Sequence, residues 1–314
     1  MSPLSKNSLK KMLKLINCAS ASKLPCQVFS LDIKNISKGY SATNPSICSY
    51  DNNLFVMVRA YAFTNHSKGS WNIDNKNYLL KLDRDFNSIA FDQLLYPHLE
   101  NKVFENTSFG FEDSRIFVWN DKLWSLSTAR SLSEHNLHQM VLSEIELNNN
   151  STRFLNCKII SPQSVPPRHE KNWMPAIRQN QLFFVYFHDP YIVLNSEGKA
   201  IISIEKSIPT QFRGGAQLIP LLEGYLSVVH EVVKINFHKK VYFHRFVFYD
   251  KSLILKSFSD PFYLFSKGIE FVAGLCLEEG SKNLLASFGV KDKLCKIARI
   301  DVNYVFDSLK NIVD

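Results

Sequence analysis

The sequence lacks the signatures of several large classes of protein. No apolar run approaches the roughly 20 residues that a membrane-spanning helix requires. No Walker loop, dinucleotide fingerprint or G-x-S-x-G motif occurs. The six cysteines include no C-x-x-C pair, and none stands at zinc-binding spacing with a histidine. These absences argue against helical membrane proteins, common nucleotide-binding folds and zinc sites, and they predict buried free thiols in a reducing compartment.

Positive charge is in excess, but it is not concentrated in one block. Lysine and arginine number 37 against 29 aspartate and glutamate residues, which gives a formal net charge of +8. Such a surplus suits an anionic partner, for example a phosphate, a sugar nucleotide or a membrane surface. No block of Lys and Arg resembles a nucleic-acid-binding arm, so we expect no nucleic-acid partner. A solvated basic surface is the alternative interpretation.

The first 24 residues form a basic segment. Lys6, Lys10, Lys11 and Lys14 interrupt its apolar residues, whereas a secretory signal needs a longer unbroken apolar region. A short amphipathic helix fits this pattern better. Such a helix can touch an anionic membrane surface or pack on the edge of a domain. We therefore expect a cytoplasmic protein, with peripheral membrane contact through residues 1–24 as a further expectation.

The remainder of the chain, residues 25–314, shows the pattern of β-strands. Short apolar or alternating runs are separated by turn residues, and the 24 Phe and 12 Tyr favour strands. The clearest runs span 54–59, 114–119, 182–187, 225–230, 241–248 and 283–289. No linker rich in Gly, Pro or Ser divides the chain. The sequence therefore predicts one all-β domain, with a helical turn at 306–312.

Five short motifs recur along this region, with steps of 68, 58, 43 and 57 residues between their first positions. They are Asn44-Pro45-Ser46-Ile47, Glu112-Asp113-Ser114-Arg115, Glu170-Lys171-Asn172-Trp173-Met174-Pro175, Arg213-Gly214-Gly215 and Glu270-Phe271-Val272. A propeller blade of four strands needs about this length, and equivalent positions on successive blades converge on a central channel. The spacing predicts a five-bladed β-propeller with a short N-terminal helix. A pair of β-sandwiches is the alternative.

The chemistry of the second motif suits acid catalysis. Asp113 lies at the start of a strand, and the adjacent Arg115 can hold one carboxylate ionised while another remains available as an acid. An Asp-x-Arg pair is more often a structural salt bridge at the rim of a blade, which is the alternative interpretation.

The third and fourth motifs suit a sugar and an anion. Lys171, Asn172 and Trp173 supply an ammonium, an amide and an aromatic face, which bind phosphate, hydroxyls and sugar rings respectively. Arg213 precedes two glycines that allow backbone amides to approach a ligand. The alternatives are a loop anchored by a buried Trp and a turn with a solvated Arg.

Further along the chain, His230 ends an apolar run and Tyr242, His244 and Arg245 follow within a few residues. This spacing predicts a second cationic cluster that faces the same pocket. A histidine satisfied within the core is the usual alternative. No facial triad or helical His pair indicates a metal.

In their order along the chain, these residues resemble those of glycoside hydrolase family 130, the mannoside phosphorylases and related β-1,2-mannosyltransferases. The resemblance runs from about residue 41 to residue 292. The matching residues are Asn44-Pro45-Ser46-Ile47, Arg59, Glu112-Asp113-Ser114-Arg115, Lys171-Asn172-Trp173, Arg213-Gly214-Gly215, His230, Tyr242, Asp250, Ser257, Pro261, Glu270-Phe271-Val272, Gly274, Ser287-Phe288-Gly289 and Asp292.

The resemblance implies a five-bladed propeller whose central cavity is an inverting active site. Asp113 would act as general acid and reach the glycosidic oxygen through a sugar hydroxyl. The residues expected to bind sugar are Asn44, Arg59, Arg115, Asn172, Trp173 and Glu270. The residues expected to bind phosphate are Lys171, Arg213, His230, Tyr242 and Arg130. No metal or organic cofactor is implied, since inorganic phosphate or a sugar phosphate is the substrate.

The chain departs from the family in three respects. It has Asp113-Ser114-Arg115 where the family usually has Asp-Pro-Arg. Arg130 and Arg168 are the candidates for further arginines that phosphorylases place before the Lys-Asn-Trp motif. The chain also lacks the extensions that phosphorylases often use to oligomerise, so its oligomeric state is not predicted.

The function predicted from these observations is inverting glycosyl transfer between a phosphate or sugar phosphate and a sugar acceptor. The enzyme would be a mannoside phosphorylase or a mannosyltransferase in glycan synthesis. A glycoside hydrolase is one alternative. It would need a base about 6.5–9.5 Å from the acid, and Glu231 and Glu270 are the candidates. A noncatalytic propeller that binds glycan or protein is the other alternative.

Overall fold

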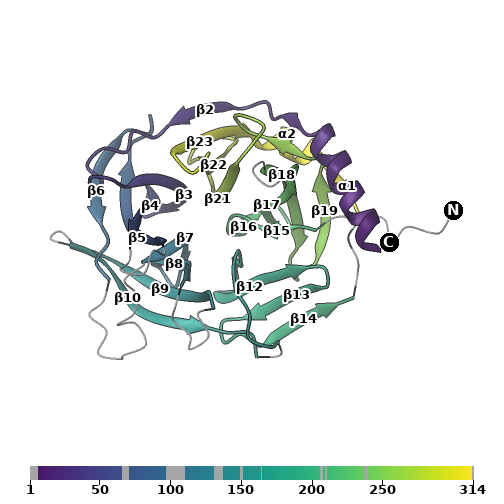
Figure 1. The fold of residues 1–314 in the computed structure, drawn as a ribbon, viewed down its shortest axis with the longest axis horizontal. Helices are drawn as coiled ribbons and strands as arrows, with labels where there is room; N and C mark the ends of the chain where they lie inside the picture. Colours follow the sequence, from purple (N-terminus) through teal and green to yellow (C-terminus); the bar gives the residue numbers. More distant parts are fainter. Residues whose placement is uncertain are drawn as a thin grey trace.

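The strands of the chain form five separate sheets arranged in a ring (Figure 1). The computed structural model describes residues 6–65, 71–96, 110–130, 137–148, 151–163, 165–205, 208, 211–236 and 240–312. Three sheets contain four consecutive antiparallel strands each. The first holds β3 (Ser41–Tyr50), β4 (Asn53–Asn65), β5 (Trp71–Leu82) and β6 (Ser88–Gln93). The second holds β7 (Phe111–Trp119), β8 (Lys122–Ala129), β9 (Gln139–Asn148) and β10 (Ser151–Ile160). The third holds β11 (Met174–Arg178), β12 (Gln181–His188), β13 (Tyr191–Asn195) and β14 (Ala200–Ile204).

The two remaining sheets join the two ends of the chain. The fourth sheet is the largest, with eight strands. It holds β1 (Ser22–Lys23), β15 (Arg213–Gly214), β16 (Ile219–Leu221), β17 (Gly224–Lys234), β18 (Lys240–Asp250), β19 (Leu255–Ser259), β20 (Phe262–Tyr263) and β24 (Leu309–Asn311). The fifth holds β2 (Gln27–Ser30), β21 (Glu270–Leu277), β22 (Asn283–Val290) and β23 (Leu294–Asp301). Because β2 from the start of the chain pairs with β23 from its end, the ring is closed by backbone hydrogen bonds.

Each junction between neighbouring sheets has its own apolar core. Five clusters of buried side chains join the first sheet to the second, the second to the third, and so on around the ring to the fifth and first. Because these strands are buried on both faces, most of their successive residues are apolar, which explains the apolar runs in the sequence. The arrangement is an all-β, propeller-like fold, and two stacked β-sandwiches would not give this cyclic series of cores.

The strand predictions are confirmed, because the six apolar runs named from the sequence lie in β4, β7, β12, β17, β18 and β22. The short N-terminal helix is also confirmed as α1 (Lys6–Ser20). The helical turn expected at 306–312 is wrong in position. Helix α2 spans Val302–Asp307, where the side chain of Asp301 caps it by accepting a hydrogen bond from the backbone N–H of Asn303 at 2.7 Å. Residues 309–311 instead form β24, which pairs with β19.

Candidate active site

A cavity of about 500 Å³ lies where the five sheets converge. Every sheet, or the loop that leads into it, contributes to its lining, so we call it the central cavity. Nine of the twelve site residues predicted from the sequence line it: Asn44, Arg59, Asp113, Arg130, Lys171, Asn172, Arg213, His230 and Tyr242. Arg115, Trp173 and Glu270 do not line it.

The side chains of three residues that line the cavity are oriented by the same backbone conformation. Asn44, Asp113 and Asn172 have left-handed conformations, with φ of 47°, 47° and 60°. Asn44 and Asp113 also lie within β-bulges of their strands. Asn and Asp tolerate this conformation better than other side chains, and a bulge redirects the side chain that it carries. This explains why an amide or carboxylate residue occurs in each of the first three motifs.

The bulge at Asn44 is supported from the fifth sheet. The Ser287 hydroxyl donates to the carbonyl of Pro45 at 2.7 Å and accepts from the backbone N–H of Ile47 at 2.9 Å. A Cβ on Gly289 would lie 2.2 Å from Oδ1 of Asn44, so only glycine leaves room for the amide there. The Ser287-Phe288-Gly289 motif therefore positions Asn44.

Asp113 is at the centre of a network of paired charges. Its Oδ1 accepts hydrogen bonds from Nδ2 of Asn44 at 2.8 Å and from Nη1 of Arg59 at 3.0 Å. Arg59 also lies 3.5 Å from the carboxylate of Glu112, and Nε of Arg130 lies 2.8 Å from the same oxygen in an ion pair that lacks hydrogen-bond angles. We call Asn44, Arg59, Glu112, Asp113 and Arg130 the paired half of the cavity.

The surrounding charges shift the pKa values of two carboxyl groups of the cavity in opposite directions. Burial alone would raise the pKa of Asp113, but the charges of Arg59 and Arg115 and the hydrogen bond from Asn44 lower it below its ordinary value. Partial burial and the neighbouring charge of Asp113 raise the pKa of Asp292, which lines the same cavity. Asp113 is therefore ionised at neutral pH in this structure, and Asp292 is the carboxyl that is easier to protonate.

The remaining cations that line the cavity have few internal partners. We call Lys171, Arg213, His230, Lys240 and Tyr242 the unpaired half. Among the residues that the structure describes, no hydrogen bond or ion pair engages the side chains of Lys171, Arg213 or Lys240. Burial, together with the charges of Arg130 and Arg59, lowers the pKa of Lys171 despite the attraction of Glu112. This crowding of positive charge favours an anion.

The sequence predicted that His230 belongs to a cationic cluster, but its imidazole ring is not charged. It is buried, and burial followed by the charges of His244, Arg213 and Arg115 places its pKa well below the ordinary value. The ring is therefore neutral. It stacks on Tyr242 with ring centroids 5.6 Å apart, and its Nδ1 has no hydrogen-bond partner within the described residues. A neutral imidazole can still donate one hydrogen bond to a phosphate oxygen.

Two other members of the expected cationic cluster point elsewhere. His244 is fully buried outside the cavity, where burial lowers its pKa to about 3. Arg245 is also buried, and it donates to Glu231 at 2.9 Å and to the carbonyl of Ser259 at 2.7 Å. Because side chains alternate along β18, Arg245 faces away from Tyr242. His244 shares the face of Tyr242 but packs against Phe262, with ring centroids 6.0 Å apart.

Arg115 is a support beneath the cavity rather than part of its lining. The side chain is fully buried. It donates to the carbonyl of Gly215 at 2.9 Å, to the carbonyl of Asp113 at 2.6 Å and to Oδ1 of Asn172 at 3.0 Å. These bonds tie the second sheet to residues of the third and fourth. The prediction that Arg115 contacts sugar is therefore corrected: Arg115 positions Asp113 and Asn172.

Trp173 and Glu270 are also buried in the protein interior, so their predicted contact with sugar is wrong. Nε1 of Trp173 donates to Glu170 at 3.0 Å, and its ring packs edge-on against Tyr186 at 5.0 Å. This is the buried Trp anchor considered as the alternative. Glu270 accepts backbone N–H bonds from Leu264 and two following residues at 2.6–2.9 Å, and thereby fixes a turn.

Two further expectations are corrected by packing. Cβ atoms on Gly214 and Gly215 would lie 1.9 Å from the carbonyl of Asn172 and 2.3 Å from that of Val228. These glycines therefore allow close packing of the backbone rather than approach to a ligand. Glu231, one of the two candidate bases, is fully buried and paired with Arg245, so it is not in the cavity.

The sequence reasoning missed several residues of the cavity. Tyr61 and Phe63 extend the row that begins with Arg59 along β4, and Phe63 is 61% exposed. The alternation along this strand is the signal that could have found them. Lys240 adds a cation at the start of β18, and Asp292 lies in the turn between β22 and β23. Phe63 and Tyr61 replace Trp173 as the aromatic faces available to a sugar ring.

The described residues contain no group of three or more His, Cys, Asp or Glu side chains with the geometry of a metal site. All six cysteines are free. No helix in the described part of the chain has the length and apolar character that crossing a membrane would require. The cavity instead offers five cations, three carboxylates, a neutral histidine and amide groups, which suit a sugar and an anion together.

Comparison with known proteins agrees with this fold. No protein-family model and no curated sequence matches the chain. Among solved structures, the β-1,2-mannobiose phosphorylase of Listeria innocua superposes with a TM-score of 0.60 at 13% identity, covering 90% of this chain and 96% of that one. A mannose phosphorylase from Leishmania mexicana in complex with phosphate superposes with a TM-score of 0.61 at 14% identity, covering 97% and 96%.

A GDP-mannose-dependent mannosyltransferase from Leishmania mexicana also superposes, with a TM-score of 0.57 at 13% identity over 96% of this chain and 98% of that one. The fold is thus shared with mannoside phosphorylases and a mannosyltransferase. These are the enzymes that the ordered sequence motifs resemble.

Proposed function

We propose that the protein is an inverting enzyme that transfers a glycosyl unit between a phosphate-bearing group and a sugar acceptor. In this proposal the five sheets are the five blades of a propeller, and residues 25–314 are one catalytic domain with residues 1–24 as an appendage. The observation that carries the proposal is the division of one cavity into a paired half and a cationic, unpaired half. This division matches a substrate that is a sugar at one end and an anion at the other.

The paired half would hold the glycosyl unit. Asn44 and Arg59 keep Asp113 oriented before any substrate arrives, because both donate to its Oδ1. Preorganised groups of this kind contribute to catalysis because they need little rearrangement during the reaction. Phe63 and Tyr61 offer aromatic faces to the sugar rings. Asn172, held by Arg115, is placed to bond a hydroxyl.

The unpaired half would hold the phosphate or the phosphate-bearing leaving group. Lys171, Arg213 and Lys240 supply charge, and His230 and Tyr242 supply hydrogen bonds. Arg130, predicted from the sequence to bind phosphate, is engaged with Glu112 in the paired half. The negative charge of a bound phosphate would also offset the positive charge of the arginines that lower the pKa of Asp113. The pKa of Asp113 would then rise, so that it could carry the proton required of a general acid.

Hydrolysis is a second candidate, which one observation favours. Asp292 is a carboxyl group in the same cavity as Asp113, whereas neither base candidate from the sequence lies there. An inverting hydrolase requires two such groups. In that reaction no phosphate would raise the pKa of Asp113, so Asp292, the carboxyl that is easier to protonate, would act as the acid and the ionised Asp113 would activate water.

The transfer assay distinguishes these reactions. The protein is incubated with mannose 1-phosphate or GDP-mannose and with mannose or mannobiose as acceptor, while release of phosphate or GDP is followed. The reverse reaction is tested with β-1,2-mannobiose in the presence and absence of phosphate. If the protein catalyses transfer, the release of phosphate or GDP should depend on the acceptor, and the cleavage of β-1,2-mannobiose should depend on phosphate. Cleavage without phosphate would indicate a hydrolase, and no turnover in any arm would indicate a binding protein.

We also propose that α1 makes the peripheral membrane contact expected from the sequence. Leu9, Met12 and Ile16 lie on one face of α1, and they are 44%, 44% and 52% exposed. Apolar residues at this spacing, beside lysines, suit the interface of an anionic membrane. Replacement of Ile16 by Gln should reduce co-flotation with anionic vesicles, and unchanged flotation would remove this role from α1.

A further inference from the structure

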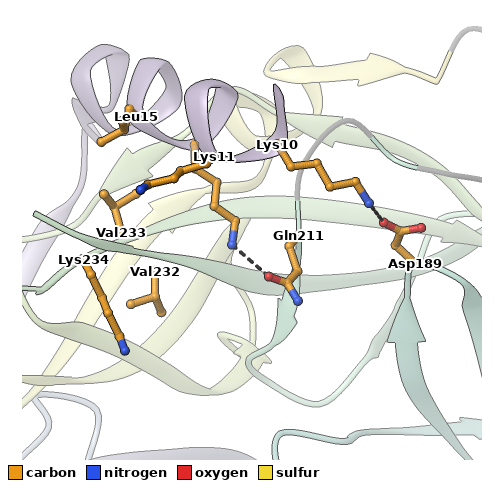
Figure 2. Close-up of a pocket in the computed structure, with 9 residues that line it drawn as sticks. Lys10, Lys11, Leu15, Asp189, Gln211, Val232, Val233 and Lys234 are labelled. Carbon is orange, nitrogen blue, oxygen red and sulfur yellow. Dashed lines mark hydrogen bonds and ion pairs between the residues drawn. The ribbon is translucent and has the colours of Figure 1, made fainter. Parts of the chain in front are cut away.

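A second basic pocket lies outside the central cavity, in a groove between α1 and the end of β17. Its volume is about 420 Å³. Figure 2 shows α1 crossing above the strands, with lysine side chains reaching down from the helix into the groove. The polar residues that line it are Lys10, Lys11, Lys14, Lys234, Asp189 and Gln211.

The helix is attached to the domain mainly at its C-terminal end. Cys18 and Ala21 pack into a small apolar cluster with Val233, Val241 and Phe243. Toward the N-terminus, α1 lies across the groove and is held by polar contacts from its lysines. Lys10 and Lys14 are thus partly buried against the domain, whereas Lys11 is exposed.

The charge in this groove is poorly balanced. Asp189 is the single carboxylate among the described residues that line the groove, and it pairs with Lys10, while Nζ of Lys14 donates to Oε1 of Gln211 at 2.9 Å. Within the described residues, neither Lys11 nor Lys234 has an ion-pair partner. Burial, Arg213 and Lys10 lower the pKa of Lys14, although Glu231 acts in the opposite direction. Gathering like charges in a half-buried groove is unfavourable unless an anion compensates them.

The groove and the central cavity share a wall. Along β17, His230 faces the cavity, and Val232 and Lys234 line the groove. Lys234 pairs in register with Lys240 of β18, which lines the cavity. Adjacent strands are about 4.8 Å apart, so the cations of the groove continue those of the unpaired half.

From this arrangement, we propose that the groove between α1 and β17 is a separate binding site for a phosphate group. The geometry fits either a soluble phosphorylated compound or the headgroup of an anionic lipid, because both present a phosphate to converging ammonium groups. This site does not depend on the transfer reaction proposed for the central cavity. Its loss should leave transfer to small acceptors unchanged.

The test uses pyrophosphate as a soluble probe. Isothermal titration calorimetry is performed on full-length protein carrying Lys171→Ala, which weakens the anion site of the central cavity, with and without the additional changes Lys14→Gln and Lys234→Gln. We expect residual pyrophosphate binding in the first protein and a loss of about tenfold for each charge removed in the second. Lys282→Gln, in an exposed turn between β21 and β22, is the matched control.

Vesicles provide the second arm and distinguish the source of the phosphate. Flotation with phosphatidylcholine vesicles is compared with and without phosphatidylserine. Vesicle binding that depends on phosphatidylserine and on Lys14 and Lys234 would assign a lipid headgroup. Pyrophosphate binding without such vesicle binding would assign a soluble ligand. If Lys14→Gln and Lys234→Gln change neither measurement while the melting temperature stays the same, the proposed site is refuted, whatever the transfer assay shows.

Discussion

The two halves of the central cavity differ in how their charges are balanced. In the paired half, the carboxylates of Glu112 and Asp113 are already engaged by Arg59, Asn44 and Arg130. In the unpaired half, Lys171, Arg213 and Lys240 have no such partners among the described residues. The paired half resembles a finished, preorganised network, whereas the unpaired half resembles one that an anion would complete. The difference suggests that one half orients the sugar and the other captures charge.

The largest effect should come from Asp113, the carboxylate at the centre of the paired half. Asp113→Asn preserves shape and still accepts the hydrogen bonds of Arg59 and Asn44 at its remaining oxygen, but it cannot donate a carboxyl proton. Removing a general acid typically costs on the order of 10²–10⁴-fold in rate. We therefore expect turnover in the transfer assay to fall by about this factor.

The control for Asp113→Asn is binding. The variant should keep a cooperative melting transition and bind mannose nearly as well as the parent protein. Near-normal turnover would exclude Asp113 as the acid and would favour a noncatalytic role. A comparable loss in Asp292→Asn, with Asp113→Asn unaffected, would move the acid role to Asp292.

The next largest effect should be a loss of stability, and it should come from substitution of Arg115, which lies beneath the cavity. Arg115→Met removes the donors for the carbonyls of Asp113 and Gly215 and for Asn172. Each buried polar group left without a partner costs about 1–3 kcal/mol. We expect the free energy of unfolding to drop by a few kcal/mol in urea denaturation. Unchanged stability together with a large rise in KM would restore Arg115 as a direct sugar ligand.

A substitution in the unpaired half should leave the stability of the protein unchanged and weaken the binding of phosphate. Lys171→Ala breaks no hydrogen bond or ion pair within the described residues, so the melting temperature without ligand should stay nearly constant. Ligand that binds the native state raises the melting temperature, and phosphate should do so in the parent protein but much less in this variant. Lys282→Ala is the control. An unchanged phosphate shift in Lys171→Ala would remove Lys171 from the anion site.

The smallest effect concerns pH and tests whether the paired half is assembled before substrate binds. The pKa of Asp113 is lowered from 3.8 in the folded protein, so its ion pairs stabilise the fold above that pH. This contribution is lost as pH falls through the folded pKa. The difference in unfolding free energy between the parent protein and Asp113→Asn should therefore stay constant from pH 7 to about pH 5 and shrink as pH falls below about 4. A difference that stays constant over the whole range would mean that the lowered pKa is wrong.

The sequence predicted the strands and most of the cavity because both depend on local patterns. Apolar runs marked the strands, and the Asn or Asp of the first three motifs marked residues that tolerate the left-handed backbone. The sequence could not separate polar residues that line the cavity from those that support it. Arg115 and Glu270 belong to the same motifs as Asp113 and Phe271, and only the three-dimensional packing shows that they bond to backbone groups.

Two further residues of the cavity were given no role from the sequence, for a related reason. Lys240 lies at the start of a strand and Asp292 in a turn, where no local pattern indicates which side chains reach the axis of the ring. Their approach to Asp113 is set by the closure of the ring and not by nearby sequence. Trp173 was assigned to sugar because aromatic faces bind sugar rings, but large aromatic residues more often fill the core.

A crystal structure with mannose 1-phosphate bound to the Asp113→Asn variant would test the roles of the two halves of the cavity most directly. We expect the phosphate in the unpaired half, with oxygens about 2.7–3.2 Å from the nitrogens of Lys171 and Arg213. The sugar should lie against Asn44 and the side chain at position 113. A phosphate bound instead to Arg59 and Arg130, with the sugar against Lys171, would reverse the roles of the two halves and overturn the proposed function of each.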